Sequence, residues 1–289
     1  MGLGSRAVVA LQYLLPQHAL TALVHRLTRS EMPWLRRLLI RGFCWLYAID
    51  LADAAQRDPD AYRSFNEFFT RGLAPGARRL PAAARAIASP CDGTVSERGT
   101  ISGDRLLQAR LRAKSRWYTL SELLGGDVQA RDFAGGEFAT IYLAPYNYHR
   151  VHMPLDGRLT ALHYLPGRLF SVSGATAAAI QNLYARNERV VCRFATAAGP
   201  VAVVFVGALN VGSIAIVGFG DLTPALPRVA RAVAVPTPAP AFTRGEELGR
   251  FNMGSTIIVL LPRGAGRWAP DFVPGASVRM GTAIGELTG

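Results

Sequence analysis

A few residues of this chain have side chains that could perform nucleophilic and acid–base chemistry. Ser255 follows Gly254 directly before an apolar run, and His149 and His152 lie together in the segment YHRVHMP. Asp92 stands in the segment SPCDGTV. A histidine within reach of a serine hydroxyl can act as its base, and a carboxylate can orient that histidine. The sequence therefore contains the residue types of an activated serine, although the motif G-x-S-x-G is absent around it.

The same residues also have ordinary structural explanations. Asp-Gly is a turn signal, and Gly-Ser-Thr before an apolar run can simply begin a strand. On a regular strand, residues i and i+3 point to opposite faces, so His149 and His152 share one site only if a tight turn lies there. Either histidine could instead be a hydrogen-bonded packing residue. We expect no metal site, because no HExxH motif or further ligand group accompanies the pair.

The amino-terminal part of the chain predicts helices. Residues 7–48 place apolar side chains at three-to-four spacing, which favours amphipathic helices. Residues 34–47 combine large apolar and aromatic side chains with arginines, as in a helix that lies in the membrane interface. The alternative is an ordinary helix packed on its own domain. Neither stretch is a clean apolar span of about twenty residues.

The rest of the chain, from residue 88 onward, predicts mainly strands. Short apolar runs are separated by turn signals such as Asp-Gly and Gly-Gly. These runs are 138–143, 190–194, 201–206 and 257–261. A helix is expected at 175–186, and the proline-rich residues 221–241 are expected to form a loop or linker. We predict an α+β fold, with a mainly antiparallel β catalytic domain over 61–289 preceded by N-terminal amphipathic helices over 1–60.

The overall charge restricts the classes of partner. The formal net charge is +12 and the pI about 10.4, and nearly all basic residues are arginines. Such a balance points to nucleic acid or to an anionic membrane surface. No helix-turn-helix, zinc-finger or RNA-binding signature accompanies the charge, so we expect no nucleic acid partner. The three cysteines form no CxxC pair, which fits free thiols in a reducing compartment.

Several segments, taken together and in order, closely resemble the bacterial phosphatidylserine decarboxylase family, in its longer membrane-associated form. Residues 245–256 (GEELGRFNMGST) resemble the processing site of that family, and 148–154 (YHRVHMP) and 89–95 (SPCDGTV) resemble its histidine and aspartate motifs. The further matching segments are FNEFFTR at 65–71, LFSV at 169–172 and NLYARNER at 182–189. The resemblance runs from about residue 60 to the carboxyl end.

The resemblance implies that the chain is a proenzyme that cuts itself between Gly254 and Ser255. The products would be a β-chain of residues 1–254 and an α-chain of residues 255–289 that remain associated. Ser255 would become a covalent pyruvoyl cofactor. Asp92 would orient His152, and His152 would activate the hydroxyl of Ser255. His149 is the candidate for the decarboxylation half of the reaction.

The implied reaction converts phosphatidylserine to phosphatidylethanolamine and releases CO2. Decarboxylation of an amino acid needs an electron sink, and pyridoxal phosphate, the usual sink, is held by a lysine. Lys114 is the only lysine and no phosphate-binding glycine loop accompanies it. A pyruvoyl group needs no lysine. The resemblance also implies a peripheral protein on the cytoplasmic face of the inner membrane, bound to anionic lipid, and it allows a homodimer.

Three other functions remain open from the residues. A serine hydrolase could use Ser255, His152 and Asp92 without any cut. A non-enzymatic membrane-surface or nucleic-acid-binding protein would explain the charge alone. A self-processing relative could act on another amino-containing phospholipid. The chain departs from the family pattern at two positions. Met253 stands where the family usually has leucine, and Ser115 stands where it often has glycine.

Overall fold

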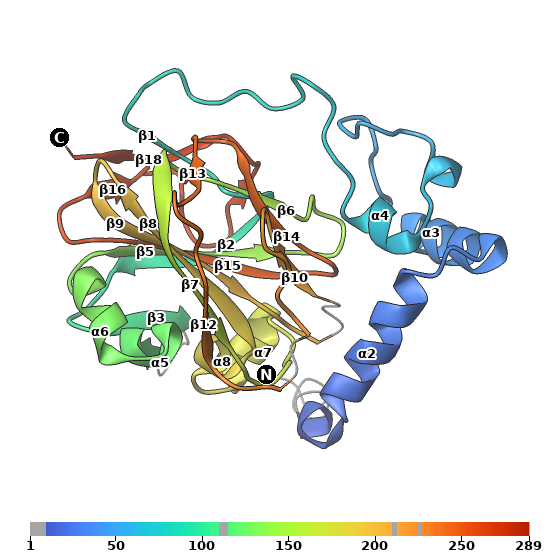
Figure 1. Cartoon of the computed structure of the whole chain (residues 1–289), viewed down its shortest axis with the longest axis horizontal. Coiled ribbons are helices and arrows are strands. Elements are labelled where there is room, and N and C mark those ends of the chain that lie inside the picture. Colours follow the sequence, from blue (N-terminus) through green and yellow to red (C-terminus); the bar gives the residue numbers. More distant parts are fainter. Residues whose placement is uncertain (1–9, 110–114, 210–212, 225–226, 289) are drawn as a thin grey trace.

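The computed structural model describes residues 10–109, 115–209, 213–224 and 227–288, so Lys114 lies outside the described residues. The body of the molecule consists of antiparallel sheets, and the helices α2 (Gln17–Thr28) and α3 (Pro33–Tyr47) lie to one side of it (Figure 1). The predicted fold class, antiparallel β preceded by N-terminal helices, is confirmed.

A nine-stranded sheet forms the centre of the body, in the order β12-β7-β8-β9-β15-β5-β2-β17, with β13 paired to β7. Its strands are β2 (Gly93–Thr100), β5 (Glu137–Leu143), β7 (Gly157–Leu165), β8 (Arg189–Thr196), β9 (Gly199–Val206), β12 (Arg231–Val233), β13 (Ala241–Phe242), β15 (Ser255–Leu261) and β17 (Ser277–Val278). Every residue of β15 is buried, and β15 pairs antiparallel with β5 and β9 on its two edges. A continuous apolar run of this length is typical of such a fully buried strand.

Smaller sheets surround the centre. A four-stranded sheet has the order β11-β10-β14-β6, a three-stranded sheet the order β1-β18-β16, and β3 pairs with β4. Their strands are β1 (Ala86–Ala88), β3 (Arg105–Ala109), β4 (Arg116–Thr119), β6 (Arg150–His152), β10 (Ile214–Ile216), β11 (Gly220–Asp221), β14 (Glu247–Phe251), β16 (Gly266–Trp268) and β18 (Ala283–Leu287). Strand β6 belongs to the histidine segment 148–154, and β14 belongs to the processing-site segment 245–256. Their pairing in the four-stranded sheet brings the two segments together.

Short helices connect the strands. They are η1 (Pro59–Ala61), α4 (Phe65–Phe69), α5 (Leu120–Leu124), α6 (Asp127–Ala130), η2 (Arg131–Phe133), α7 (Gly174–Ala179) and α8 (Leu183–Arg186). Local sequence fixes their starts. Ser64 caps α4 by accepting a hydrogen bond from Glu67 N, and Thr119 and Glu122 form a reciprocal capping box on α5.

Two sequence predictions need correction. The helix expected at 175–186 is two helices, α7 and α8, because Asn182 takes a left-handed backbone conformation with φ 55°. The segment 221–241 is not wholly a loop, because β12 and the start of β13 pair with β7. Residues 225–226 lie outside the described part of that segment.

The helical region is joined to the body by packing and by hydrogen bonds. Ile40 of α3 is buried in a small apolar cluster that also contains the aromatic residues Tyr62, Phe65, Phe68 and Phe69. Gln17 of α2 accepts a hydrogen bond from Leu169 N at 2.9 Å, and Arg29 forms an ion pair with Asp221 at 2.8 Å. The division at residue 60 therefore crosses this cluster, and it stays a prediction.

None of the helices within the described residues is long and apolar enough to cross a bilayer.

Candidate functional site

The turn from β14 to β15 holds the bond between Gly254 and Ser255. Met253, one residue earlier, has φ 116°, which is rare for a residue with a side chain and costs on the order of 1–3 kcal/mol. A Cβ atom added to Gly254 would lie 3.4 Å from Leu143 O and 3.5 Å from His149 Nε2. The backbone next to the bond is thus strained, and an imidazole nitrogen adjoins it.

Asn252 holds this turn in place. Its Nδ2 donates to Ser213 Oγ and, at 3.3 Å, to Asp221 Oδ1, while its Oδ1 accepts from Asn66 Nδ2 at 3.1 Å. Its backbone N–H also donates to Ser213 O at 2.9 Å. The side chain is almost fully buried, so these bonds are shielded from competing water. They fix the backbone that leads into Met253.

Ser255 is the first residue of β15 and is fully buried. Its backbone is paired with Leu143 of β5, while its Oγ has no hydrogen-bond partner in the part of the chain that the structure describes. An unpaired buried hydroxyl costs about 1–3 kcal/mol, and such groups in a folded protein call for an explanation in function. A free hydroxyl at this position is available as a nucleophile.

His149 is also fully buried, and neither of its ring nitrogens has a hydrogen-bond partner among the residues described. Its ring packs against Phe69 at a tilt of 35°, with the centroids 4.0 Å apart. Burial, and secondarily the charge of Arg71, lowers the pKa of His149 to about 3. The imidazole is therefore neutral, and its Nε2 lies beside Gly254.

His152 has different surroundings. Its Nδ1 lies 2.8 Å from Gly245 O and its Nε2 lies 2.9 Å from Tyr148 Oη. A carbonyl oxygen only accepts, so Nδ1 carries the proton and Nε2 accepts from the tyrosine hydroxyl. Burial lowers the pKa of His152. The expected hydrogen bonds from His152 to Asp92 and to Ser255 are not formed, and the Gly245 carbonyl orients the ring in place of the carboxylate.

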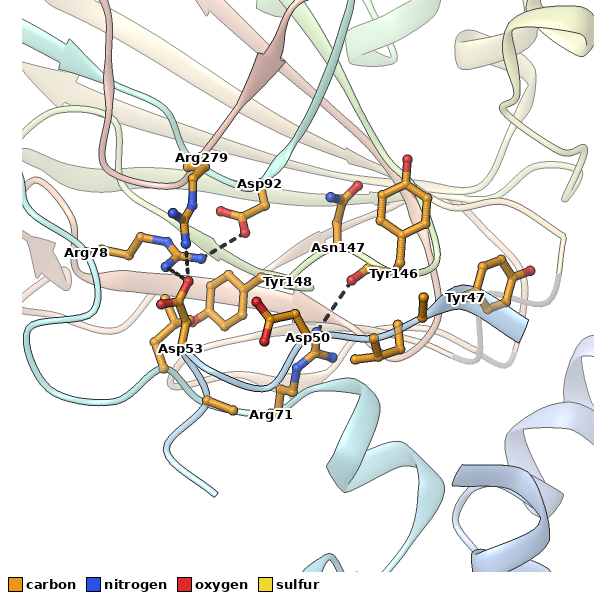
Figure 2. A pocket seen from close by; sticks show the side chains of 14 residues that line it. Tyr47, Asp50, Asp53, Arg71, Arg78, Asp92, Tyr146, Asn147, Tyr148 and Arg279 are labelled. Atoms are coloured by element: carbon orange, nitrogen blue, oxygen red, sulfur yellow. Dashed lines mark hydrogen bonds and ion pairs between the residues drawn. The ribbon is translucent and has the colours of Figure 1, made fainter. Parts of the chain in front are cut away.

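Asp92 lies at the wall of a polar pocket. Its Oδ2 accepts from Arg78 Nη2 at 3.0 Å, and its Oδ1 accepts from Met280 N at 2.7 Å (Figure 2). This pocket has a volume of about 250 Å³ and is also lined by Tyr148. Asp92 and His152 are therefore near one another without a direct contact, and Tyr148 lies between the two environments.

A second, more apolar cavity of about 220 Å³ reaches the bond itself. Its lining includes Gly254, Met253, Phe69 and Tyr47. Tyr47 lines the polar pocket as well, so the two spaces share a wall at the end of α3. An amphiphilic molecule could occupy both sides of this wall.

Sequence reasoning did not single out Tyr148, Phe69 and Arg71 as site residues. All three lie inside segments that carry the family resemblance, Tyr148 in YHRVHMP and the other two in FNEFFTR. Their positions within those segments were the only available signal. Contacts between segments about 80 residues apart in the chain brought them together.

The residues around Gly254 fit a group made from Ser255. A buried hydroxyl without a partner adjoins a glycine carbonyl, and an imidazole without a partner adjoins the same glycine. Within the described residues no three histidine, cysteine or acidic side chains cluster as metal ligands. The polar groups described around the site are a hydroxyl, imidazoles, a tyrosine and guanidinium groups.

Comparison with known proteins decides the family. A family model described as phosphatidylserine decarboxylase matches residues 65–286, and a second, described as PSD, matches residues 7–48. The chain belongs to the phosphatidylserine decarboxylase family. Membership in the phosphatidylserine decarboxylase family confirms the resemblance and the enzyme class, a decarboxylase, that the resemblance implied.

Similar relatives share almost the whole chain. A phosphatidylserine decarboxylase proenzyme of Methylococcus capsulatus is 47% identical over 278 residues, which cover 96% of this chain and 95% of the relative. The proenzyme of Alcanivorax borkumensis is 46% identical, with 100% and 98% covered. That of Alkalilimnicola ehrlichii is 48% identical, with 95% and 94% covered. The similarity therefore includes the helical region as well as the sheets.

Proposed function

We propose that this chain cuts itself between Gly254 and Ser255, turns Ser255 into a pyruvoyl group, and then decarboxylates phosphatidylserine to phosphatidylethanolamine. One observation carries the proposal: the buried Ser255 hydroxyl and the buried His149 imidazole, both without partners, adjoin Gly254. The relatives named as phosphatidylserine decarboxylase proenzymes support the substrate and a processing step. The cut gives a β-chain of residues 1–254 and an α-chain of residues 255–289.

The cut begins when Ser255 Oγ attacks the carbonyl carbon of Gly254. The peptide C–N bond breaks, and an ester to Oγ and a free amine at residue 255 form. A base then removes the α-proton of residue 255, and the carboxylate of Gly254 leaves as the new carboxyl terminus. Water hydrolyses the dehydroalanine that remains, which releases ammonia and leaves the pyruvoyl group. Strain at Met253 raises the ground state of the bond that breaks.

His152 is the proposed base for the cut, with Asp92 and Tyr148 as positioning residues. Its Nδ1 proton is held by Gly245 O, which leaves Nε2 as the basic nitrogen. Tyr148 Oη occupies Nε2 in the resting structure, so the tyrosine must relay the proton or move aside before the histidine acts. The ion pair between Asp92 and Arg78 holds the wall of the polar pocket in place beside Tyr148.

In the decarboxylation, a pyruvoyl group held at residue 255 would supply the electron sink for the α-carbon of the substrate. His149 and Phe69 provide an apolar, water-poor wall beside that position. A leaving carboxylate disperses its charge, so an apolar wall favours the transition state over the bound substrate. His149 then holds or delivers the proton that replaces the carboxylate.

The helical region is proposed to hold the enzyme on the cytoplasmic face of the inner membrane. Large apolar side chains on α3 are exposed, among them Trp34 at 63% and Trp45 at 85%. Arg37 and Arg41 pair with Asp60, so the aromatic face contributes more to this proposal than the charge does. A groove of about 390 Å³ between α2 and α3 is almost wholly apolar and includes Met253 in its lining, which suits a lipid substrate.

The proposal is tested by intact mass spectrometry together with CO2 release from phosphatidylserine. Wild type should give two chains that meet at 254/255. Ser255→Ala should stay whole and inactive, and His152→Ala should stay largely whole. His149→Ala should be cut but release CO2 at least about 100-fold more slowly. His163→Gln, a histidine of β7, is the matched control and should behave as wild type.

Different outcomes would overturn different parts of this proposal. A Ser255→Ala protein that still splits at this bond would remove the self-cutting mechanism. A whole His149→Ala chain would make His149, rather than His152, the base for the cut. A cut wild-type protein that releases no CO2 from phosphatidylserine would shift the substrate to another amino-containing phospholipid.

A further inference from the structure

Among the described residues, Arg71 is a buried cation without a carboxylate partner. The residue is 8% exposed, and its Nη1 has no hydrogen-bond partner. Its Nη2 makes one long hydrogen bond, 3.5 Å to Tyr146 O, and its guanidinium lies over the ring of Phe68. Burying an unpaired charge is costly, and an anion supplied from outside would remove that cost.

The guanidinium of Arg71 faces the polar pocket of about 250 Å³ that Asp92 also lines (Figure 2). The other two arginines in the lining are already neutralised. Arg78 pairs with Asp53 at 2.5 Å and with Asp92 at 3.0 Å, and Arg279 pairs with Asp53. Among the described residues that line the pocket, Arg71 is thus the cation that remains available to a ligand.

Among the described residues of the lining, Asp50 is the acidic group that has no ion pair with an arginine, so its charge opposes the binding of an anion. Its Oδ1 accepts a hydrogen bond from Ala52 N at 2.8 Å. The lining therefore holds three arginines and three aspartates. Affinity for an anion must come from the fork of the Arg71 guanidinium, not from a general positive potential.

The pocket is next to the reacting position. Phe69, two residues before Arg71, packs on His149, and His149 Nε2 adjoins Gly254. The charge of Arg71 is felt at His149, where it contributes to the lowered pKa. A ligand whose amine is at residue 255 can therefore extend past His149 toward Arg71.

We propose that Arg71 binds the phosphodiester of the substrate headgroup. This assignment rests on the proposed function and adds a phosphate subsite to it. The headgroup carries two anions, a carboxylate and a phosphate. The carboxylate leaves as CO2, so a cation bound to it would stabilise the substrate more than the transition state. The phosphate keeps its charge throughout, and a bidentate guanidinium matches its geometry.

The test uses glycerophosphoethanolamine, which has the phosphodiester and the amine but no carboxylate. In cut wild-type enzyme it should inhibit phosphatidylserine decarboxylation competitively. Arg71→Met should raise its inhibition constant at least about 10-fold, since the charge-assisted hydrogen bonds to the phosphate are lost. Arg71→Lys should recover only part of the loss. Arg63→Met, an exposed arginine outside the pocket, is the matched control and should leave inhibition unchanged.

A variant that is expected to strengthen inhibition separates the loss of the phosphate contact from a general loss of structure. Asp50→Asn keeps the acceptor for Ala52 N but removes a negative charge that faces the ligand, so glycerophosphoethanolamine should inhibit more strongly. If Arg71→Met fails to cut, calorimetric binding of the same compound to Ser255→Ala, with and without Arg71→Met, replaces inhibition. Unchanged binding or inhibition in Arg71→Met overturns the phosphate subsite.

One further result would also overturn it. A raised KM for phosphatidylserine with unchanged glycerophosphoethanolamine inhibition would assign Arg71 to the carboxylate. Failure of the proposed function looks different, because the wild type itself would then release no CO2.

Discussion

At the scale of single residues, the site is characterised by groups that burial keeps uncharged or unpaired. His149 has a pKa lowered to about 3 from 6.5, mainly by burial. In the unfolded chain the same imidazole takes up a proton near its ordinary pKa. As the pH falls below 6.5, the unfolded state therefore binds a proton that the folded state does not, and the free energy of unfolding decreases.

This difference predicts a pH-dependent loss of stability. Between pH 7 and pH 5, His149 should remove about 2 kcal/mol from the free energy of unfolding, at 1.36 kcal/mol per unit of pKa difference. His149→Phe should not show this part of the loss. Urea unfolding of the uncut Ser255→Ala chain, with and without His149→Phe, measures it, and the other histidines cancel between the two proteins. Parallel pH profiles would contradict a neutral, buried His149.

The sequence identified which residue types belong together, but it could not supply the contacts among them. Motif order was enough to name Asp92, His149, His152 and Ser255, and their catalytic roles stay a prediction. The orienting partner of His152 is a backbone carbonyl, that of Gly245, and no side-chain pattern can reveal such a partner. Arg71 could not be recognised either, because its importance lies in lacking a carboxylate partner among the described residues, which no sequence pattern reveals.

At the scale of elements, the turn between β14 and β15 sets the geometry of the cut. Asn252 holds this turn through hydrogen bonds of its side chain to three other side chains and through one backbone hydrogen bond. Asn252→Ala should slow the appearance of the two chains at least about 10-fold, because the strained Met253 can then relax. Asn66→Ala removes one of these bonds and should slow cutting less.

The measurement is a time course of newly synthesised protein by intact mass. Equal rates for wild type and Asn252→Ala would show that the turn needs no side-chain support. Retention of the fold is checked by circular dichroism, since loss of a buried hydrogen-bonded amide costs about 1–3 kcal/mol of stability.

The strands were the most predictable elements. Runs such as 138–143 and 257–261 are apolar enough to be central strands, and they are β5 and β15. The predicted helix at 175–186 was wrong in one respect, because Asn182 interrupts it in a left-handed conformation that periodicity does not encode. Strand β12 was missed because its pairing with β7 comes from tertiary contact, in a segment whose prolines indicate a loop.

At the scale of the whole molecule, α3 lies to one side of the sheets (Figure 1), and several of its large apolar side chains are exposed. The double variant Trp34→Ala/Trp45→Ala should weaken sedimentation with vesicles that contain phosphatidylserine, several-fold at physiological salt, because two exposed aromatic anchors are lost. Val128→Ala changes an equally exposed apolar residue on α6 and should have no effect. Undiminished sedimentation of the double variant would assign membrane binding to another surface.

The place of β15 in the centre of the largest sheet has a consequence for the lifetime of the cut enzyme. The α-chain would be held by ladders on both edges of β15, so it stays while the fold stays. After one unfolding event, however, the two pieces separate, and reassembly follows mass action between dilute partners instead of the first-order refolding of one chain. The cut would thus provide the catalytic group but remove the ability to refold as a single chain. Each cut molecule would work until it first unfolds.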